Sequence, residues 1–166
     1  AKLPGARLCG AKMNKAKLAQ VDLSKADLSG ANLTGADLTE SNLRDCDLSR
    51  ANLTEAILQK ANLKSTFLIG ANLQKTDLTD VNLEGANISG VKLGKANCQK
   101  ANMKNVDLQR SDLEHADFAQ ANLAGANLTG SKLVDAHFKN ANLTGANLNL
   151  TDTTDTDFSD AKGYNS

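Results

Sequence analysis

Hydrophobic residues recur along this chain with a period of five, and polar residues fill the positions between them. Divided into blocks of five from Ala1, the sequence gives 32 consecutive blocks up to Asp160 without insertion or deletion. The third residue of the block is Leu in 24 blocks, and the first is Ala, Val, Ser, Thr or Cys. The second is usually Asn or Asp, and Gly is frequent at the fifth. The chain is therefore one long internal repeat.

A period of five excludes the two common secondary structures. In a helix, five residues turn through about 500°, so successive Leu side chains would spiral around every side. In an uninterrupted strand, an odd period would send successive Leu side chains to opposite faces. A short strand of three residues followed by a turn at the fourth and fifth keeps the first and third residues of every block inside.

The residues at the turn positions fit this solution. A type II β-turn needs a positive φ at its second central residue, which favours Gly, and Gly occupies the fifth position ten times. The only Pro, Pro4, stands at the first central position, which type II turns also favour. Blocks that end in Lys, Glu, Asp or Gln are expected to use a turn without positive φ.

Blocks such as "ADLSG", "ANLTG", "ADLTE" and "ANLQK" resemble the pentapeptide repeat family, whose consensus is A(D/N)LXX. The resemblance covers residues 1–160 and is closest to cyanobacterial and lumenal members that have no assigned function. It implies an all-β fold, a right-handed quadrilateral parallel β-helix with one coil per four blocks and about eight coils. Residues 1–160 would form this β-helix and residues 161–166 a C-terminal tail.

Inward positions follow from the block. The third-position side chains are expected to fill the core, among them Leu28, Leu48, Leu68, Leu78, Leu83, Cys98, Phe118 and Phe138. Cys46 also falls at an inward position, whereas Cys9 points outward. Residues twenty apart are expected to stack, and such a column of Asn side chains can hydrogen-bond from coil to coil. That column contains Asn42, Asn62, Asn82, Asn102, Asn122 and Asn142.

Outward positions carry two departures from the polar pattern. Ile57, Phe67 and Ile69 are large and apolar where polar residues are the rule, and they are candidates for a partner-binding patch. Scattered exposed hydrophobic residues are the alternative interpretation.

The two histidines stand in columns that also contain carboxylates. Imidazole and carboxylate groups at this spacing could hold a divalent metal such as Zn²⁺, and the candidates are His115, Asp135, His137 and Asp117. The alternative is a solvated surface of ion pairs. No cofactor is expected.

Composition limits the possible functions. The formal net charge is +0, which does not favour a nucleic-acid-binding protein. No apolar run approaches the roughly 18 residues of a membrane span. The three Cys residues argue against a disulfide framework. The sequence is compatible with the cytoplasm, or with the periplasm or thylakoid lumen if a targeting segment was removed before Ala1.

The charges are unevenly distributed along the chain. Residues 1–20 carry five basic residues and no acid, and residues 151–160 carry four Asp. Weak end-to-end self-association is therefore conceivable, because the open ends of a β-helix are unpaired strand edges.

No catalytic motif is present in the sequence, and an enzyme is not expected. The main hypothesis is a structural module, a rigid rod that presents its faces to a protein partner. The alternative is a DNA-mimicking protein that binds gyrase or a related topoisomerase, as the resemblance implies for some family members. A third hypothesis is weak binding of a divalent metal at the two histidines.

Overall fold

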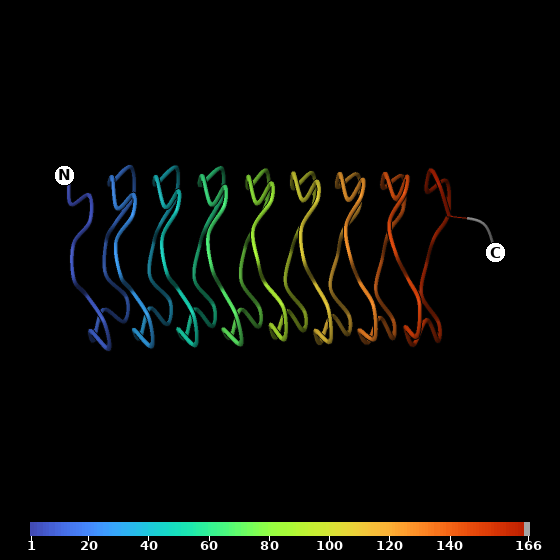
Figure 1. The fold of residues 1–166 in the computed structure, drawn as a ribbon, viewed down its shortest axis with the longest axis horizontal. Coiled ribbons are helices and arrows are strands. Elements are labelled where there is room, and N and C mark those ends of the chain that lie inside the picture. Colours follow the sequence, from blue (N-terminus) through green and yellow to red (C-terminus); the bar gives the residue numbers. More distant parts are fainter. Residues whose placement is uncertain (165–166) are drawn as a thin grey trace.

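The computed structural model describes residues 1–164 and shows a regular rod, with the N-terminus at one end and the last described residues at the other (Figure 1). The second residue of each block forms a parallel β-bridge with the residue twenty positions later, as Asn42 does with Asn62. One coil therefore takes twenty residues, or four blocks. Within residues 1–164 there is no helix, and no strand extends beyond a single bridged residue.

Three backbone hydrogen bonds per block join one coil to the next. The N–H of Leu23 donates to the carbonyl of Asn42 at 2.8 Å, and the N–H of Asn42 donates back to Val21 at 2.9 Å. The N–H of Lys25 donates to the carbonyl of Arg44 at 2.9 Å. The same pattern recurs from coil to coil, so that the rod is held together by bonds between residues about twenty apart.

The predicted turn at the fourth and fifth positions is confirmed. The N–H of Ala26 donates to the carbonyl of Leu23 at 3.0 Å, which closes a β-turn with the fourth and fifth residues at its centre. The expectation for blocks that end in a residue other than Gly is wrong. All such residues also have positive φ, from 53° at Asp155 to 61° at Gln120. The next block can stack in line only if every turn has the same shape, and this requirement outweighs the preference of these side chains for negative φ.

The core is a set of stacked columns of third-position side chains. From Leu23 to Leu143 they are at most 2% exposed, and the first-position residues beside them are equally covered. Burial of each Leu contributes roughly 2 kcal/mol before conformational entropy is counted. The sequence-expected core residues, including Leu78, Leu83 and Cys98, lie in these columns.

One column ends in a stack of aromatic rings. Phe118 and Phe138 have ring centroids 4.8 Å apart, and Phe138 and Phe158 follow at 5.3 Å. The ring of Tyr164, from the C-terminal tail, lies on Phe158 with a centroid distance of 3.8 Å. The tail therefore folds over the last coil and covers this part of the core.

Candidate interaction surface

In the blocks whose second residue is Asn or Asp, short hydrogen bonds within the block organise the outer layer of the rod. The side-chain oxygen of the second residue accepts the backbone N–H of the fourth, as Asp37 Oδ1 does from Thr39 at 3.0 Å. The Thr39 hydroxyl donates to the same oxygen at 2.7 Å. This arrangement explains why Asn or Asp is preferred at the second position and Ser or Thr at the fourth.

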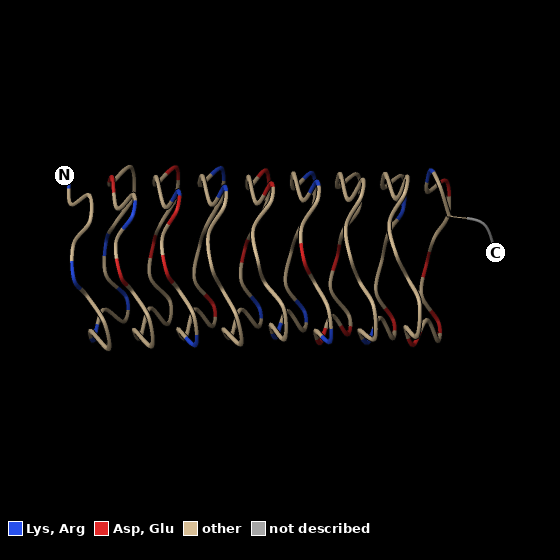
Figure 2. Ribbon diagram, viewed as in Figure 1, with Lys and Arg blue, Asp and Glu red and all other residues tan. Residues whose placement is uncertain are grey.

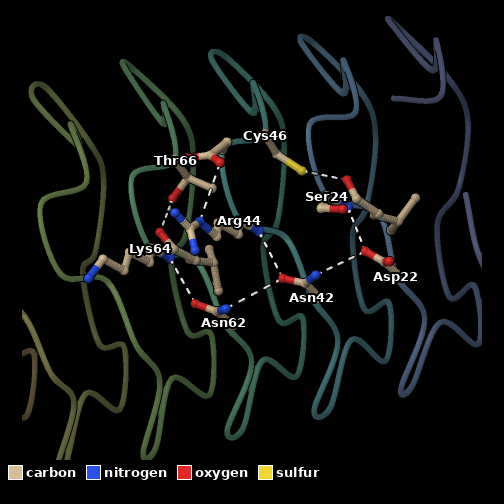
Figure 3. Close-up of polar contacts among 11 residues, drawn as sticks. Asp22, Ser24, Asn42, Arg44, Cys46, Asn62, Lys64 and Thr66 are labelled. Carbon is tan, nitrogen blue, oxygen red and sulfur yellow. Dashed lines mark hydrogen bonds and ion pairs between the residues drawn. The ribbon is translucent and has the colours of Figure 1, made fainter. Parts of the chain in front are cut away.

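The predicted hydrogen bonding along the Asn column is confirmed for three of its pairs. Asn62 Nδ2 donates to Asn42 Oδ1 at 3.4 Å, and the matching bonds at Asn102 and Asn142 are 3.2 Å long. Figure 3 shows the start of this column, where Asn42 also donates to Asp22 at 3.0 Å. Part of the hydrogen-bonding capacity of these Asn side chains is therefore used between coils.

Besides Leu150 near the C-terminal end of the rod, large apolar side chains interrupt the polar outer layer at two separate places. Phe67 is 50% exposed and Ile69 is 44% exposed, and they belong to the same block. Phe67 bridges Asp47 and Asn87, whereas Ile57, which is 41% exposed, bridges other residues half a coil away. A single patch of all three residues is therefore wrong, because four blocks per coil put Ile57 on a different side from Phe67.

Ile69 stands between two shallow hollows that follow one corner of the rod. The first is lined by Arg50 and by small residues around it, and the second by Gly70, Gly90 and Arg110 among others. The hollows exist because Gly residues at the fifth position leave the corner without side chains. Neither arginine forms an ion pair within residues 1–164, so both guanidinium groups remain open to a partner. Phe67, Ile69, Arg50 and Arg110 are hereafter called the corner surface.

Arg50 and Arg110 were not singled out from the sequence. The signal that could have found them is the twenty-residue spacing, which places both in one column with Gly30, Gly70 and Gly90. In that column two Gly residues separate Arg50 from Arg110, which leaves a hollow between the two long side chains.

The histidine columns do not bring the four candidate metal ligands together. His115 Nδ1 lies 3.6 Å from Asp135 Oδ2, whereas His137 lies in another column between Asp117 and Asp157. Asp117 accepts a hydrogen bond from Gln99 at 2.6 Å. Among residues 1–164, no group of three or more His, Cys, Asp or Glu side chains converges. The four candidate residues thus fall into two groups. His115 lies with Asp135, and His137 lies with Asp117 in another column.

The cysteines offer no reactive pair. Cys46 and Cys98 are buried, and burial raises the pKa of the Cys46 thiol to about 11. Burial also raises the pKa of Cys98. Cys9 is exposed, and it lies beside the first hollow of the corner. The two buried thiols are therefore inert, small components of the core.

No helix within the described part of the chain is long and apolar enough to cross a membrane.

The geometry and the sequence lead to the same class of protein. The family model of pentapeptide repeats matches residues 1–30, 31–68, 56–94, 82–120 and 121–160, in 8 copies. The chain belongs to the pentapeptide repeat family, and its fold is the right-handed β-helix of that family.

Two solved structures show how far the likeness extends. The chain is 32% identical to HetL, a pentapeptide repeat protein involved in heterocyst differentiation regulation from the cyanobacterium Nostoc sp. strain PCC 7120. The match covers 99% of this chain and 82% of HetL, with a TM-score of 0.55. Full-length QnrB1, a plasmid-mediated fluoroquinolone resistance protein, is 20% identical over 97% of this chain and 90% of its own, with a TM-score of 0.51. At that identity, QnrB1 shows the fold alone. No curated protein matched the chain.

Proposed function

We propose that this protein is a non-catalytic interaction module, a rigid rod that binds a protein partner at the corner surface. The observation that carries the proposal is the half-exposure of Phe67 and Ile69, two large apolar side chains of one block, in an outer layer that is polar at most other positions. The proposal takes the rod to be a quadrilateral helix of about eight coils, which the four series of bridged residues and the twenty-residue coil support.

The composition of the corner surface suits a protein partner. Aromatic and arginine side chains are enriched among the residues that dominate binding energy at protein interfaces. Covering the exposed parts of Phe67 and Ile69 would contribute roughly 25 cal/mol for each Å² of apolar surface removed from water. Arg50 and Arg110 lie on either side of Ile69. Their guanidinium groups would contribute positive charge to the interface and help to orient the partner. The match to HetL covers 99% of this chain, and HetL is involved in the regulation of heterocyst differentiation. This regulatory role of a similar protein also supports a function through binding.

The charge distribution gives less support to the DNA-mimic hypothesis. Acidic and basic residues are interleaved along the rod (Figure 2), whereas a mimic of duplex DNA needs a continuous acidic surface. The formal net charge of the chain is +0.

Affinity capture from the organism that makes the protein, with quantitative mass spectrometry, tests the proposal. The variant Phe67→Asn/Ile69→Ser gives this block the same residues as its neighbours in each column, Asn87 and Ser89, and should keep the fold. Ile57→Asn is the matched control, because it removes an exposed apolar side chain on another side.

We expect partners captured by the parent chain to be retained by the Ile57→Asn variant and lost by the double variant. Equal capture by all three chains, with equal melting temperatures, would disprove binding at the corner surface. A smaller loss with Arg50→Gln alone would show that the adjacent guanidinium takes part.

A further inference from the structure

Two arginines stand at opposite ends of an open stretch of the corner surface. Arg50 and Arg110 are exposed, occupy the fifth position of their blocks and lie three coils apart in one column, with Gly70 and Gly90 between them. A Cβ added at either of these glycines would meet no atom of another coil within 4 Å. Arg110 Cγ lies 3.8 Å from the corresponding point at Gly130, on the far side of the stretch. The corner between the two arginines is therefore uncovered.

The hollow in this stretch has an apolar side chain at its edge. Ile69, which is 44% exposed, lines it together with Gly70, Gly90 and Arg110. Asp107 is the only carboxylate residue among those that line the two hollows of the corner within residues 1–164. Its Oδ1 accepts hydrogen bonds from the backbone and side-chain nitrogens of Gln109, both at 3.1 Å. The stretch thus offers positive charge at its two ends and an apolar contact between them.

The spacing of the coils decides which partner backbone suits these groups. Successive coils are about 4.8 Å apart, so the backbones at Arg50 and Arg110 are about 14 Å apart along the rod. In an extended strand, residues four positions apart point to the same side and are separated by about 13 Å. In a helix, residues on one face are seven or eleven positions apart, or about 10.5 and 16.5 Å. An extended segment therefore matches the two arginines better than a helix.

We infer that the corner surface binds an extended acidic segment of the partner, with two carboxylates four residues apart and an apolar residue midway between them. The inference rests on the proposed function and specifies the chemistry of the partner. The carboxylates pair with Arg50 and Arg110 through charge-assisted hydrogen bonds. The middle residue points to the same side of the strand as the two acids, so it enters the hollow beside Ile69.

The backbone at these positions accepts either sign of charge, which allows the pairing to be reversed. Glu40 and Glu55, also at fifth positions, have φ of 55° and 59°. Arg50 and Arg110 have φ of 58° and 54°. Arg50→Glu/Arg110→Glu should therefore keep the fold while it reverses the charge at both ends of the stretch.

Titration of isotope-labelled protein with short peptides, followed through backbone N–H chemical shifts, tests the inference. The probe is STETVTETS with acetylated and amidated ends, whose glutamates are four residues apart. Its isomer STVTETETS has the same composition with the glutamates two residues apart, and STKTVTKTS reverses both charges. Lys60→Glu/Lys100→Glu is the matched protein control, because it makes the same change of net charge at fifth positions of another column. About 100 mM NaCl largely screens charges more than about 10 Å away.

We expect STETVTETS to shift the N–H signals of Gly70 and Gly90, and to bind the parent chain and the lysine control with similar affinity. Arg50→Gln or Arg110→Gln alone should weaken binding about two- to fivefold, as for an exposed ion pair. The isomer should bind the parent chain about threefold more weakly than STETVTETS. Arg50→Glu/Arg110→Glu should bind STKTVTKTS in place of STETVTETS. Unchanged signals of buried residues verify that each variant is folded.

Equal binding of the two isomers, or binding of STETVTETS that survives reversal of both arginines, overturns the inference. The absence of shifts at Gly70 and Gly90 with up to about 5 mM peptide does the same. These failures are distinguishable from failure of the proposed function. If capture from the cell is still lost with Phe67→Asn/Ile69→Ser, the corner surface binds a protein by other chemistry, and only the acidic segment is refuted.

Discussion

The backbone N–H of Ser111 donates a hydrogen bond to Oγ of Ser131, 3.2 Å away and one coil further along the rod. The hydroxyl of Ser131 in turn donates to the carbonyl of Leu108 at 2.6 Å. The Ser131 hydroxyl is thus accommodated in the core because it accepts one hydrogen bond and donates another. Ser41 is the contrasting case, since its buried Oγ has no hydrogen-bond partner within residues 1–164.

Replacing the two serines by Ala should therefore have opposite effects. Ser41→Ala removes an unsatisfied buried hydroxyl and should raise the free energy of unfolding by about 1 kcal/mol. Ser131→Ala leaves the N–H of Ser111 without an acceptor and should lower it by about 1–2 kcal/mol. Urea denaturation followed by circular dichroism measures both changes. Two changes of the same sign would contradict this account of the core.

The uniform positive φ at fifth positions predicts a second pair of opposite changes. Gly85 has φ of 65° and free space around its Cα, so Gly85→Ala adds backbone strain without a clash and should cost about 1 kcal/mol. Leu150 has φ of 59° with its side chain 88% exposed, so Leu150→Gly should stabilise by about 0.5–1 kcal/mol. Thermal unfolding measures both changes: the melting temperature should fall for Gly85→Ala and rise for Leu150→Gly.

Stability should fall in acid because aspartates in the outer layer have lowered pKa values. The hydroxyl and backbone N–H of Thr39 hold the pKa of Asp37 below 3.8, and Ser29 does the same for Asp27. The folded-state pKa is the lower one, so the stabilisation is present above pH 3.8 and is lost as the pH falls through the folded value. We expect urea midpoints to decrease between pH 7 and about pH 3.

Asp37→Asn separates this effect from general acid unfolding. Asn can accept the same hydrogen bonds but does not titrate, so the variant should lose less stability between the two pH values than the parent chain. An unchanged pH dependence would show that this carboxylate does not contribute.

A break in the middle of the core should divide the rod. Leu78 is fully buried, and Leu78→Ala should cost about 3 kcal/mol, mostly from the cavity that it leaves. Leu78→Asp places a charge in the core and should uncouple the coils on either side, because each coil contacts only its neighbours. Hydrogen exchange would detect this as lost protection around residue 78. Leu148→Ala, near the end of the rod, should cost less.

Much of this fold could be predicted from the period alone. The frequent Leu at the third position of the block and the recurrent Gly at the fifth predicted inward side chains and a turn at the fourth and fifth positions. The reason for Asn or Asp at the second position was not apparent, because the partner is a backbone N–H such as that of Thr39, which every residue but Pro carries. The common positive φ was missed because the constraint comes from stacking between coils and is absent from any single block.

The surface was harder to predict than the core. Phe67 and Ile69 could be recognised as exposed apolar residues. Ile57 was wrongly grouped with them, because ten residues are half a coil and place it on a different side of the rod from Phe67. The position of Tyr164 could not be derived, since the tail departs from the period that placed all other residues.

The twenty-residue coil also limits how the gene for such a protein can change in length. Duplication or loss of twenty codons would lengthen or shorten the rod by about 4.8 Å and keep every column in line. Gain or loss of a single five-codon unit would preserve the core equally well but rotate everything downstream by one block. Between Arg50 and Ile69, such a change would separate the two on different sides of the rod while leaving the protein folded.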